Sequence, residues 1–86
     1  MIIKMFSVRD NAVEAWLQPF FAPTTGAALR SLTEAVNDPS HQFAKHASDY
    51  TLWEVGAFDD ATGILSYDPL FPVRVVSCIE LVQKPN

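Results

Sequence analysis

The chain has 86 residues, of which 49% are hydrophobic and 19% charged, and its formal net charge is −4 at pH 7. This length suits one domain, residues 1–86, and this composition excludes a disordered chain. The single cysteine excludes an internal disulfide framework, and no stretch reaches the roughly 18 apolar residues of a membrane-spanning helix. We therefore expect a cytosolic protein that makes no contact with a membrane.

The first predicted element is a strand over residues 2–8, because apolar side chains alternate onto both of its faces. Arg9-Asp10-Asn11 then predicts a turn, since short Asp and Asn side chains bond their own backbone. Residues 13–18 fit two structures: a second strand with Trp16 on one face, or a short helical turn. Two prolines bound the apolar connector that follows, residues 19–23.

One helix is predicted to begin at Thr24 or Thr25, whose hydroxyl can accept hydrogen bonds from the first free amides. An apolar stripe at three- to four-residue spacing runs along it through Ala28 and Leu32. Asn37-Asp38-Pro39 ends the helix, because proline cannot continue the hydrogen-bond ladder. Residues 40–49 then form a polar loop that holds both histidines and has room for a single helical turn.

Three further strands are predicted in the second half of the chain. Residues 51–58 alternate, which places Trp53 on one face and Phe58 on the other. Residues 59–63 fit a short hairpin loop with Gly63 in the left-handed conformation, and residues 64–67 return as the partner strand. Residues 73–82 carry the longest strand pattern. Together these elements predict an α+β fold, an antiparallel sheet of four to five strands with one packed helix.

Metal-binding and catalytic patterns are sparse. His41 and His46 lie five residues apart between Asp38 and Asp49, but structural zinc prefers four ligands with cysteine among them. Cys78 lies within the last predicted strand, where a small buried side chain is far commoner than a nucleophile. No glycine-rich phosphate-binding motif is present. We therefore expect no catalytic residues, no metal and no other cofactor, in a protein that is not an enzyme.

Charge is unevenly distributed along the chain. Residues 31–68 hold seven of the ten acidic residues but only one basic residue, Lys45. Because nucleic-acid affinity usually rests on clustered Lys and Arg at phosphates, a nucleic-acid surface would have to be local and rely on aromatic stacking. The acidic segment fits either a solvated face or a surface for a basic partner.

Aromatic side chains are numerous for so small a core. The chain has six Phe, two Trp and two Tyr, and most of them lie near predicted connectors or strand ends. An exposed ring can stack on an unpaired base for roughly 1–3 kcal/mol. The alternative is that these rings form the core and a seam between two copies of the chain.

Several short segments together resemble one phage family. They are FSVRD at residues 6–10, Pro19-Phe20-Phe21, AALR at residues 27–30, AVNDP at residues 35–39, Asp49-Tyr50 and the GxFD pattern at residues 56–59. In this order they resemble the small nonstructural protein of gokushoviruses, which are single-stranded DNA phages of the Microviridae. The resemblance covers residues 5–65, and none of its segments is a catalytic motif.

The resemblance implies a non-enzymatic phage protein that binds single-stranded DNA and acts as an accessory in DNA replication. It would aid the switch from duplex replication to single-strand synthesis and packaging, in the cytoplasm of the infected bacterial host. Dimerisation would align basic patches from two subunits and offset the net charge, so a homo-oligomer is expected, with a dimer favoured. The phosphate-contact candidates are Lys4, Arg9, Arg30 and Lys45, and the base-stacking candidates are Trp16, Phe20, Phe21 and Tyr50.

The alternative function is an acidic protein-interaction module that never contacts DNA. Its acidic segment, residues 31–68, would bind a basic region of a host replication enzyme or of another phage protein. An open edge strand, such as the one predicted over residues 73–82, would offer a second way to add to a partner's sheet. The charge distribution favours this alternative, whereas the aromatic content and the resemblance favour DNA binding.

Overall fold

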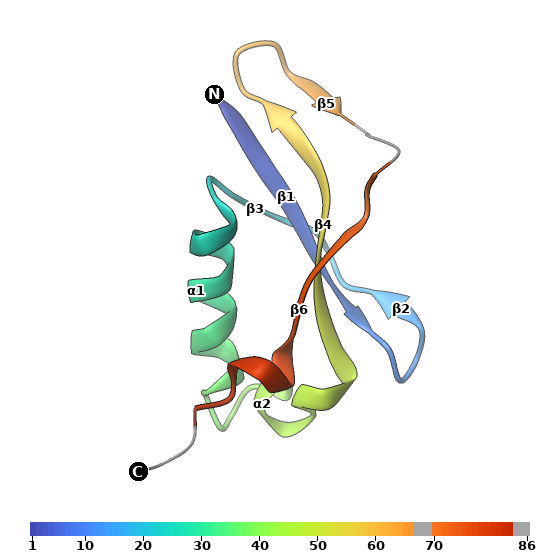
Figure 1. The fold of residues 1–86 in the computed structure, drawn as a ribbon, viewed down its shortest axis with the longest axis vertical. Helices are drawn as coiled ribbons and strands as arrows, with labels where there is room; N and C mark the ends of the chain where they lie inside the picture. The colour runs from blue at the N-terminus through green and yellow to red at the C-terminus, as the bar shows by residue number, and fades with distance from the viewer. Residues whose placement is uncertain (67–69, 84–86) are drawn as a thin grey trace.

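The computed structural model describes residues 1–66 and 70–83. Within these ranges the chain forms a six-stranded antiparallel sheet with one main helix, which confirms the predicted α+β fold (Figure 1). The strands are β1 (Ile2–Asp10), β2 (Ala15–Trp16), β3 (Phe20–Ala22), β4 (Tyr50–Asp59), β5 (Ile64–Ser66) and β6 (Val73–Ser77). The α-helices are α1 (Thr25–Val36) and α2 (Gln42–Lys45), and the 3₁₀ helices are η1 (Ala47–Asp49) and η2 (Cys78–Leu81).

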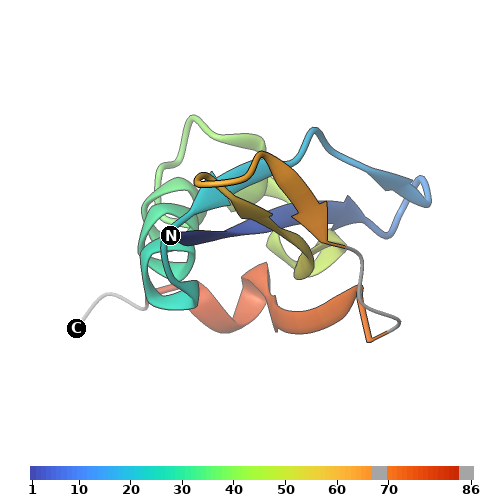
Figure 2. The same ribbon diagram turned by 90° about the horizontal axis from the view of Figure 1, so that it is seen from above.

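The central pair of the sheet is β1 and β4, which pair from Ile2 opposite Asp59 to Asp10 opposite Tyr50. β2 and β3 both pair with the outer edge of β1, and β5 and β6 both pair with the outer edge of β4. Figure 2 shows β2 and β3 on one side of this central pair and β6 on the other. Each of the two long central strands therefore pairs with two short edge strands.

The main helix begins and ends as the sequence predicts. The Thr24 hydroxyl caps α1 by accepting a hydrogen bond from the Ala27 amide at 3.1 Å. At the other end, the Asn37 side-chain amide donates to the carbonyl oxygens of Thr33 and Leu81, at 2.8 and 3.0 Å. Asn37 thus closes the helix and fastens it to the end of η2.

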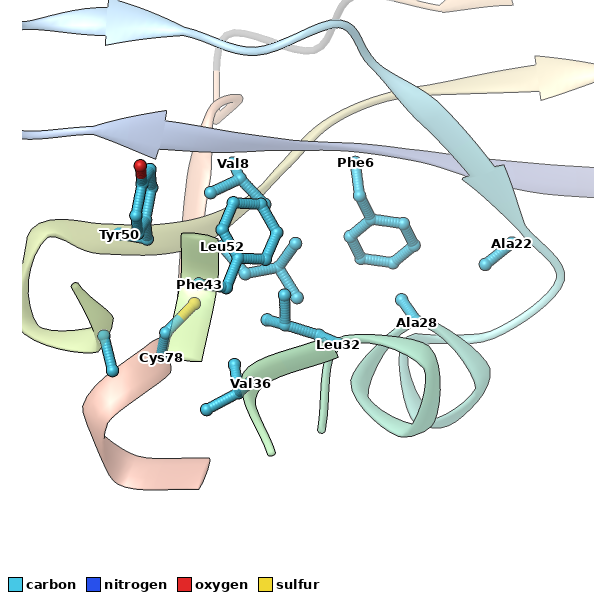
Figure 3. Close-up of a cluster of buried hydrophobic side chains, with 11 residues drawn as sticks. Phe6, Val8, Ala22, Ala28, Leu32, Val36, Phe43, Tyr50, Leu52 and Cys78 are labelled. Carbon is cyan, nitrogen blue, oxygen red and sulfur yellow. The ribbon is translucent and has the colours of Figure 1, made fainter. Parts of the chain in front are cut away.

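The core lies between α1 and one face of the sheet. Figure 3 shows Phe6 and Val8 directed from β1 toward α1. Phe43 from α2 and Cys78 from η2 are buried in the same cluster, so all of these helical segments contribute to one core. The opposite face of the sheet has no helix over it in the described part of the chain. In Figure 1, α1 lies to the left of β1 and β4, whereas β2 and β5 lie to the right of these two strands.

Two segments differ from their predicted structures near the first proline. The predicted connector over residues 19–23 contains β3, because Phe20–Ala22 pairs with β1 and so raises the strand count above four to five. Residues 13–18 contribute only the two-residue strand β2, after a turn, and no helical turn. The loop over residues 40–49 holds the helical turn for which it has room, as α2, and also the 3₁₀ helix η1. The predicted end of the fifth strand, Tyr67, lies outside the described residues.

The predicted long strand over residues 73–82 is wrong beyond Ser77. Ser77 and Glu80 form a capping box, in which the Glu80 carboxylate accepts a hydrogen bond from the Ser77 amide at 2.7 Å. This S-x-x-E spacing starts a helical turn rather than continuing a strand, which explains the change into η2. Cys78 is fully buried, as expected, but in η2 rather than within a strand.

A one-residue bulge in β4 changes which side chains share a face. The pairing of β4 with β1 skips Val55, so the strict alternation predicted for residues 51–58 fails there. As a result Trp53 and Phe58, predicted on opposite faces, lie on the same face. A second bulge displaces the pairing of β6 with β4 beside Trp53.

Backbone strain is expected in the turn between β1 and β2. Glu14 is the only described residue other than glycine with a positive φ, at 56°. This conformation costs a residue with a Cβ about 1–2 kcal/mol, so Glu14→Gly should be more stable than Glu14→Ala by about 1 kcal/mol. Both variants remove the same charge, so their difference in urea denaturation isolates the backbone effect. Ala12→Gly is the control and should lose stability; equal stability of the two Glu14 variants would contradict the strain.

Candidate nucleic-acid interface

The face of the sheet away from α1, called the open face below, is defined by the register of the strands. Its positions are Ile3, Met5, Ser7 and Arg9 of β1, Trp16 of β2, Phe21 of β3, Thr51, Trp53, Gly56 and Phe58 of β4, Leu65 of β5, and Arg74 and Ser77 of β6. This set includes four aromatic residues and two arginines but no acidic residue. Trp16, Phe21 and Leu65 are exposed, whereas Ser7, Thr51 and Gly56 are buried. Exposed aromatic and apolar side chains on one face mark an interaction surface.

Two tryptophans meet at one end of the open face and form the tryptophan pair. Trp16 is 45% exposed, and its ring centroid lies 5.6 Å from that of Trp53 in an edge-to-face arrangement. The Trp53 Nε1 is buried and has no hydrogen-bond partner among the described residues. An unpaired buried donor costs about 1–3 kcal/mol.

Two phenylalanines form the phenylalanine pair toward the other end of the open face. Phe21 is 54% exposed, and its ring centroid lies 6.0 Å from that of Phe58, again edge to face. Ile3, Leu65 and Gly63 join these rings around an apolar hollow of about 480 Å³. Gly63 has the predicted left-handed conformation, with φ at 76°, and brings the β4–β5 turn to the rim of the hollow.

Both arginines of the open face lie at the tryptophan end, each opposite one tryptophan in the register. The Arg9 guanidinium donates to the Asn11 side-chain oxygen at 2.6 Å, and no described carboxylate lies within ion-pair distance of it. Arg74 forms an ion pair with Glu80 at 3.3 Å. The hydrogen bond from the Ser77 amide, and then Arg74, hold the pKa of the Glu80 carboxyl below its usual value.

Apart from Glu80, which pairs with Arg74, the carboxylates of β1 and β4 lie away from the open face. In the register, Asp10, Glu54 and Asp59 occupy the helix side of the sheet. Asp60, at the β4–β5 turn, is paired with the N-terminal ammonium group at 2.7 Å. The strand positions of the open face are therefore basic in a chain whose net charge is −4, although Glu80 offsets the charge of Arg74. A local basic surface beside aromatic rings is the arrangement that nucleic-acid binding requires in an acidic protein.

Three predicted phosphate-contact residues lie away from the open face. Lys4 is on the helix side, where its Nζ donates to the Thr25 hydroxyl at 3.2 Å and lies 3.6 Å from the Glu54 carboxylate. Arg30 and Lys45 are exposed on α1 and α2. These cations are separated from the aromatic pairs by the sheet and the core, so they do not form one surface with them.

Two predicted stacking residues belong to the core side. Tyr50 is only 6% exposed and packs on Phe43 with ring centroids 4.7 Å apart, so its predicted role in base stacking is wrong. Phe20 is half-buried and stacks on Phe6 at 5.8 Å. Its position follows from strand geometry, because Phe20 and Phe21 are adjacent in β3 and must point to opposite faces.

The structure brings three predicted contact residues together on the open face: Arg9, Trp16 and Phe21. Their neighbours on β4 and β6 were not predicted as contact residues. The only sequence signal was the five-residue spacing of Trp53 and Phe58, which puts two rings on one face only if the strand contains a bulge. Arg74 offered no comparable signal, because its face depends on the bulge in β6.

Other reactive side chains have structural roles. The His41 Nδ1 accepts a hydrogen bond from the Phe43 amide at 3.1 Å and so caps α2. Within residues 1–66 and 70–83, no group of three or more His, Cys, Asp and Glu could hold a metal ion. Burial raises the pKa of the Cys78 thiol to about 11, which keeps it protonated near neutral pH. None of the described helices has the length and apolarity needed to cross a bilayer.

Comparison with models of known protein families assigns the chain to one of them. A sequence model of the phage ORF5 protein family matches residues 3–81. The chain belongs to the phage ORF5 protein family. In this phage ORF5 protein the matched range takes in every position of the open face. No curated protein and no solved structure matches the chain.

Proposed function

We propose that this phage ORF5 protein is a non-enzymatic single-stranded DNA-binding protein that assists phage DNA replication in the cytoplasm of the infected host. The main support for the proposal is the open face, which combines exposed aromatic rings with two arginines and has no acidic residue at its strand positions, although Glu80 of η2 pairs with Arg74. Unpaired bases can stack on such rings, whereas the bases of a duplex are already stacked and paired. This chemistry fits the switch to single-strand synthesis and packaging in the gokushoviruses that the sequence resembles.

Stacking rather than charge supplies most of the expected affinity. Each contact of a ring with a base contributes roughly 1–3 kcal/mol. If each arginine meets one phosphate, the logarithm of the binding constant should fall with the logarithm of salt concentration with a slope of only about −1.4. A homodimer, which the proposal also expects, would add avidity by placing two open faces on one strand.

A fluorescence titration tests the proposal, because both tryptophans of the chain lie on the open face. A short oligothymidylate is expected to quench their emission saturably, more strongly at low than at high salt, and a matching duplex should quench it less. No response to either DNA at low salt and high protein concentration would contradict direct DNA binding. The salt series also gives the slope, which a surface rich in phosphate contacts would make much steeper.

The Arg74–Glu80 ion pair should compete with phosphate for Arg74. Glu80→Gln keeps an oxygen that can accept from the Ser77 amide but removes the charge, so we expect roughly two- to fivefold tighter binding of oligothymidylate. Glu34→Gln, on the exposed side of α1, is the matched control and should leave the affinity unchanged. Equal effects of the two substitutions would mean that only net charge matters.

The same carboxylate predicts an acid-sensitive contribution to the stability of η2. Because the folded pKa of Glu80 is lowered, this contribution is present above the ordinary carboxyl pKa and is lost as the pH falls through the lowered value. Glu80→Gln should lack this part of the pH dependence.

An acidic protein-interaction module is the second candidate. The observation that favours it is the exposure of Glu34 on α1 and of Asp38 just after this helix, away from the open face. Their partner would be a basic region of a host replication enzyme or of another phage protein. A pull-down of purified host replication proteins without nucleic acid, abolished by Glu34→Gln with Asp38→Asn but unaffected by Trp16→Ala, would favour this function over DNA binding.

A further inference from the structure

The tryptophan pair has a defined position across β1. Trp16 lies opposite Arg9 on one side of the strand, and Trp53 lies opposite Ser7 on the other side. The two rings therefore span β1 with an offset of two residues. The more exposed ring belongs to a short edge strand, and the half-buried ring behind it belongs to β4.

The phenylalanine pair repeats this position. Phe21 lies opposite Met5 on one side of β1, and Phe58 lies opposite Ile3 on the other side. The offset is again two residues, and the exposed ring again comes from an edge strand with the half-buried ring on β4. Both pairs are also edge to face. The second pair is therefore the first one displaced by four residues along β1.

The displacement corresponds to a length of single-stranded DNA. Four residues of a strand extend over roughly 13 Å. A stacked nucleic-acid strand advances about 3.4 Å per nucleotide, so about four steps cover this distance. One strand of about five nucleotides that runs along β1 can therefore place a base against each aromatic pair.

We propose that the open face holds two separate base-stacking subsites for one single strand, one at the tryptophan pair and one at the phenylalanine pair. This inference rests on the DNA-binding function proposed above and adds to it the number of subsites and the length of strand that fills them. The subsites are unequal, because Arg9 and Arg74 lie at the tryptophan end while the phenylalanine end is apolar. Short strands bind at the tryptophan pair, and only longer strands reach the phenylalanine pair.

The test is the affinity for oligothymidylates of increasing length, from about two to about eight nucleotides, for the wild type and three variants. Phe21→Leu keeps an apolar side chain in the hollow but removes the stacking face, and Phe21→Tyr keeps both. Ile64→Ala is the matched control, because Ile64 is exposed on the same arm of the sheet but on the opposite face in the register. Sedimentation of each variant reports its oligomeric state.

The wild-type affinity is expected to rise by a step of roughly five- to 150-fold near about five nucleotides. The step should persist in Phe21→Tyr and Ile64→Ala and disappear in Phe21→Leu, while the affinity for the shortest strand stays the same in all four proteins.

Three results would overturn the inference while DNA binding itself stands: a step that survives in Phe21→Leu, a loss of affinity in Phe21→Leu that is equal at every length, or a change in its oligomeric state. A changed oligomeric state would mean that the apolar hollow is part of an interface between two copies of the chain. If the wild type binds no length of strand, the proposed function itself fails.

Discussion

Phe6→Ala is expected to lower the free energy of unfolding by about 3–5 kcal/mol. The Phe6 side chain is fully buried, and its ring stacks on Phe20 at 5.8 Å, so truncation leaves a cavity between β1 and α1. Because small domains are stable by only about 5–15 kcal/mol, this loss removes a large part of the total. Urea denaturation followed by tryptophan fluorescence measures it.

Phe21→Ala is the matched control for this prediction. It removes the same side chain from the same sheet, but Phe21 is 54% exposed on the open face. Its free energy of unfolding should therefore fall by less than about 1 kcal/mol. If the two alanine variants lost equal stability, the division of the sheet into a core side and an open side would be wrong.

Trp16→Ala is expected to weaken the binding of a single-stranded oligothymidylate by roughly five- to 150-fold, which corresponds to about 1–3 kcal/mol for one stacked base. Trp53 remains in this variant as the fluorescent reporter. Because Trp16 is 45% exposed, the substitution should leave the fold intact, which circular dichroism checks.

Arg30→Ala is the control for the position of the interface. Arg30 lies on the exposed side of α1, away from the open face, so both the affinity and its salt slope should be unchanged. If Arg30→Ala bound DNA more weakly and Trp16→Ala bound it with unchanged affinity, the DNA contact would lie on α1. The aromatic pairs would then have no part in binding.

Local signals predicted much of the fold. The Thr24 cap and the Asn37-Asp38-Pro39 stop predicted α1, and Gly63 predicted the turn between β4 and β5, because each depends on residues adjacent in sequence. What failed depends on pairing between distant segments. The bulge at Val55 is set by the register of β4 against β1, which alternation within one strand cannot reveal.

The candidate site was predicted only in part, for the same reason. Arg9, Trp16 and Phe21 were expected as contact residues and share the open face, but their common face follows from two separate pairings, of β2 and of β3 with β1. Tyr50 was misplaced because an aromatic residue at the start of a strand can be exposed or buried, and here Phe43 of α2 packs against it. The capping box that begins at Ser77 is the one signal present in the sequence that the strand prediction overrode.

The most direct test of the open face is a nuclear magnetic resonance titration of isotope-labelled protein with a short oligothymidylate. Chemical-shift changes of the backbone amide and tryptophan indole N–H signals then show which residues contact the DNA. If the open face binds the DNA, the largest chemical-shift changes are expected at Arg9, Trp16, Phe21 and Trp53. The signals of Arg30 on α1 should not shift. Changes confined to α1 and α2, or none at saturating DNA, would contradict binding at the open face.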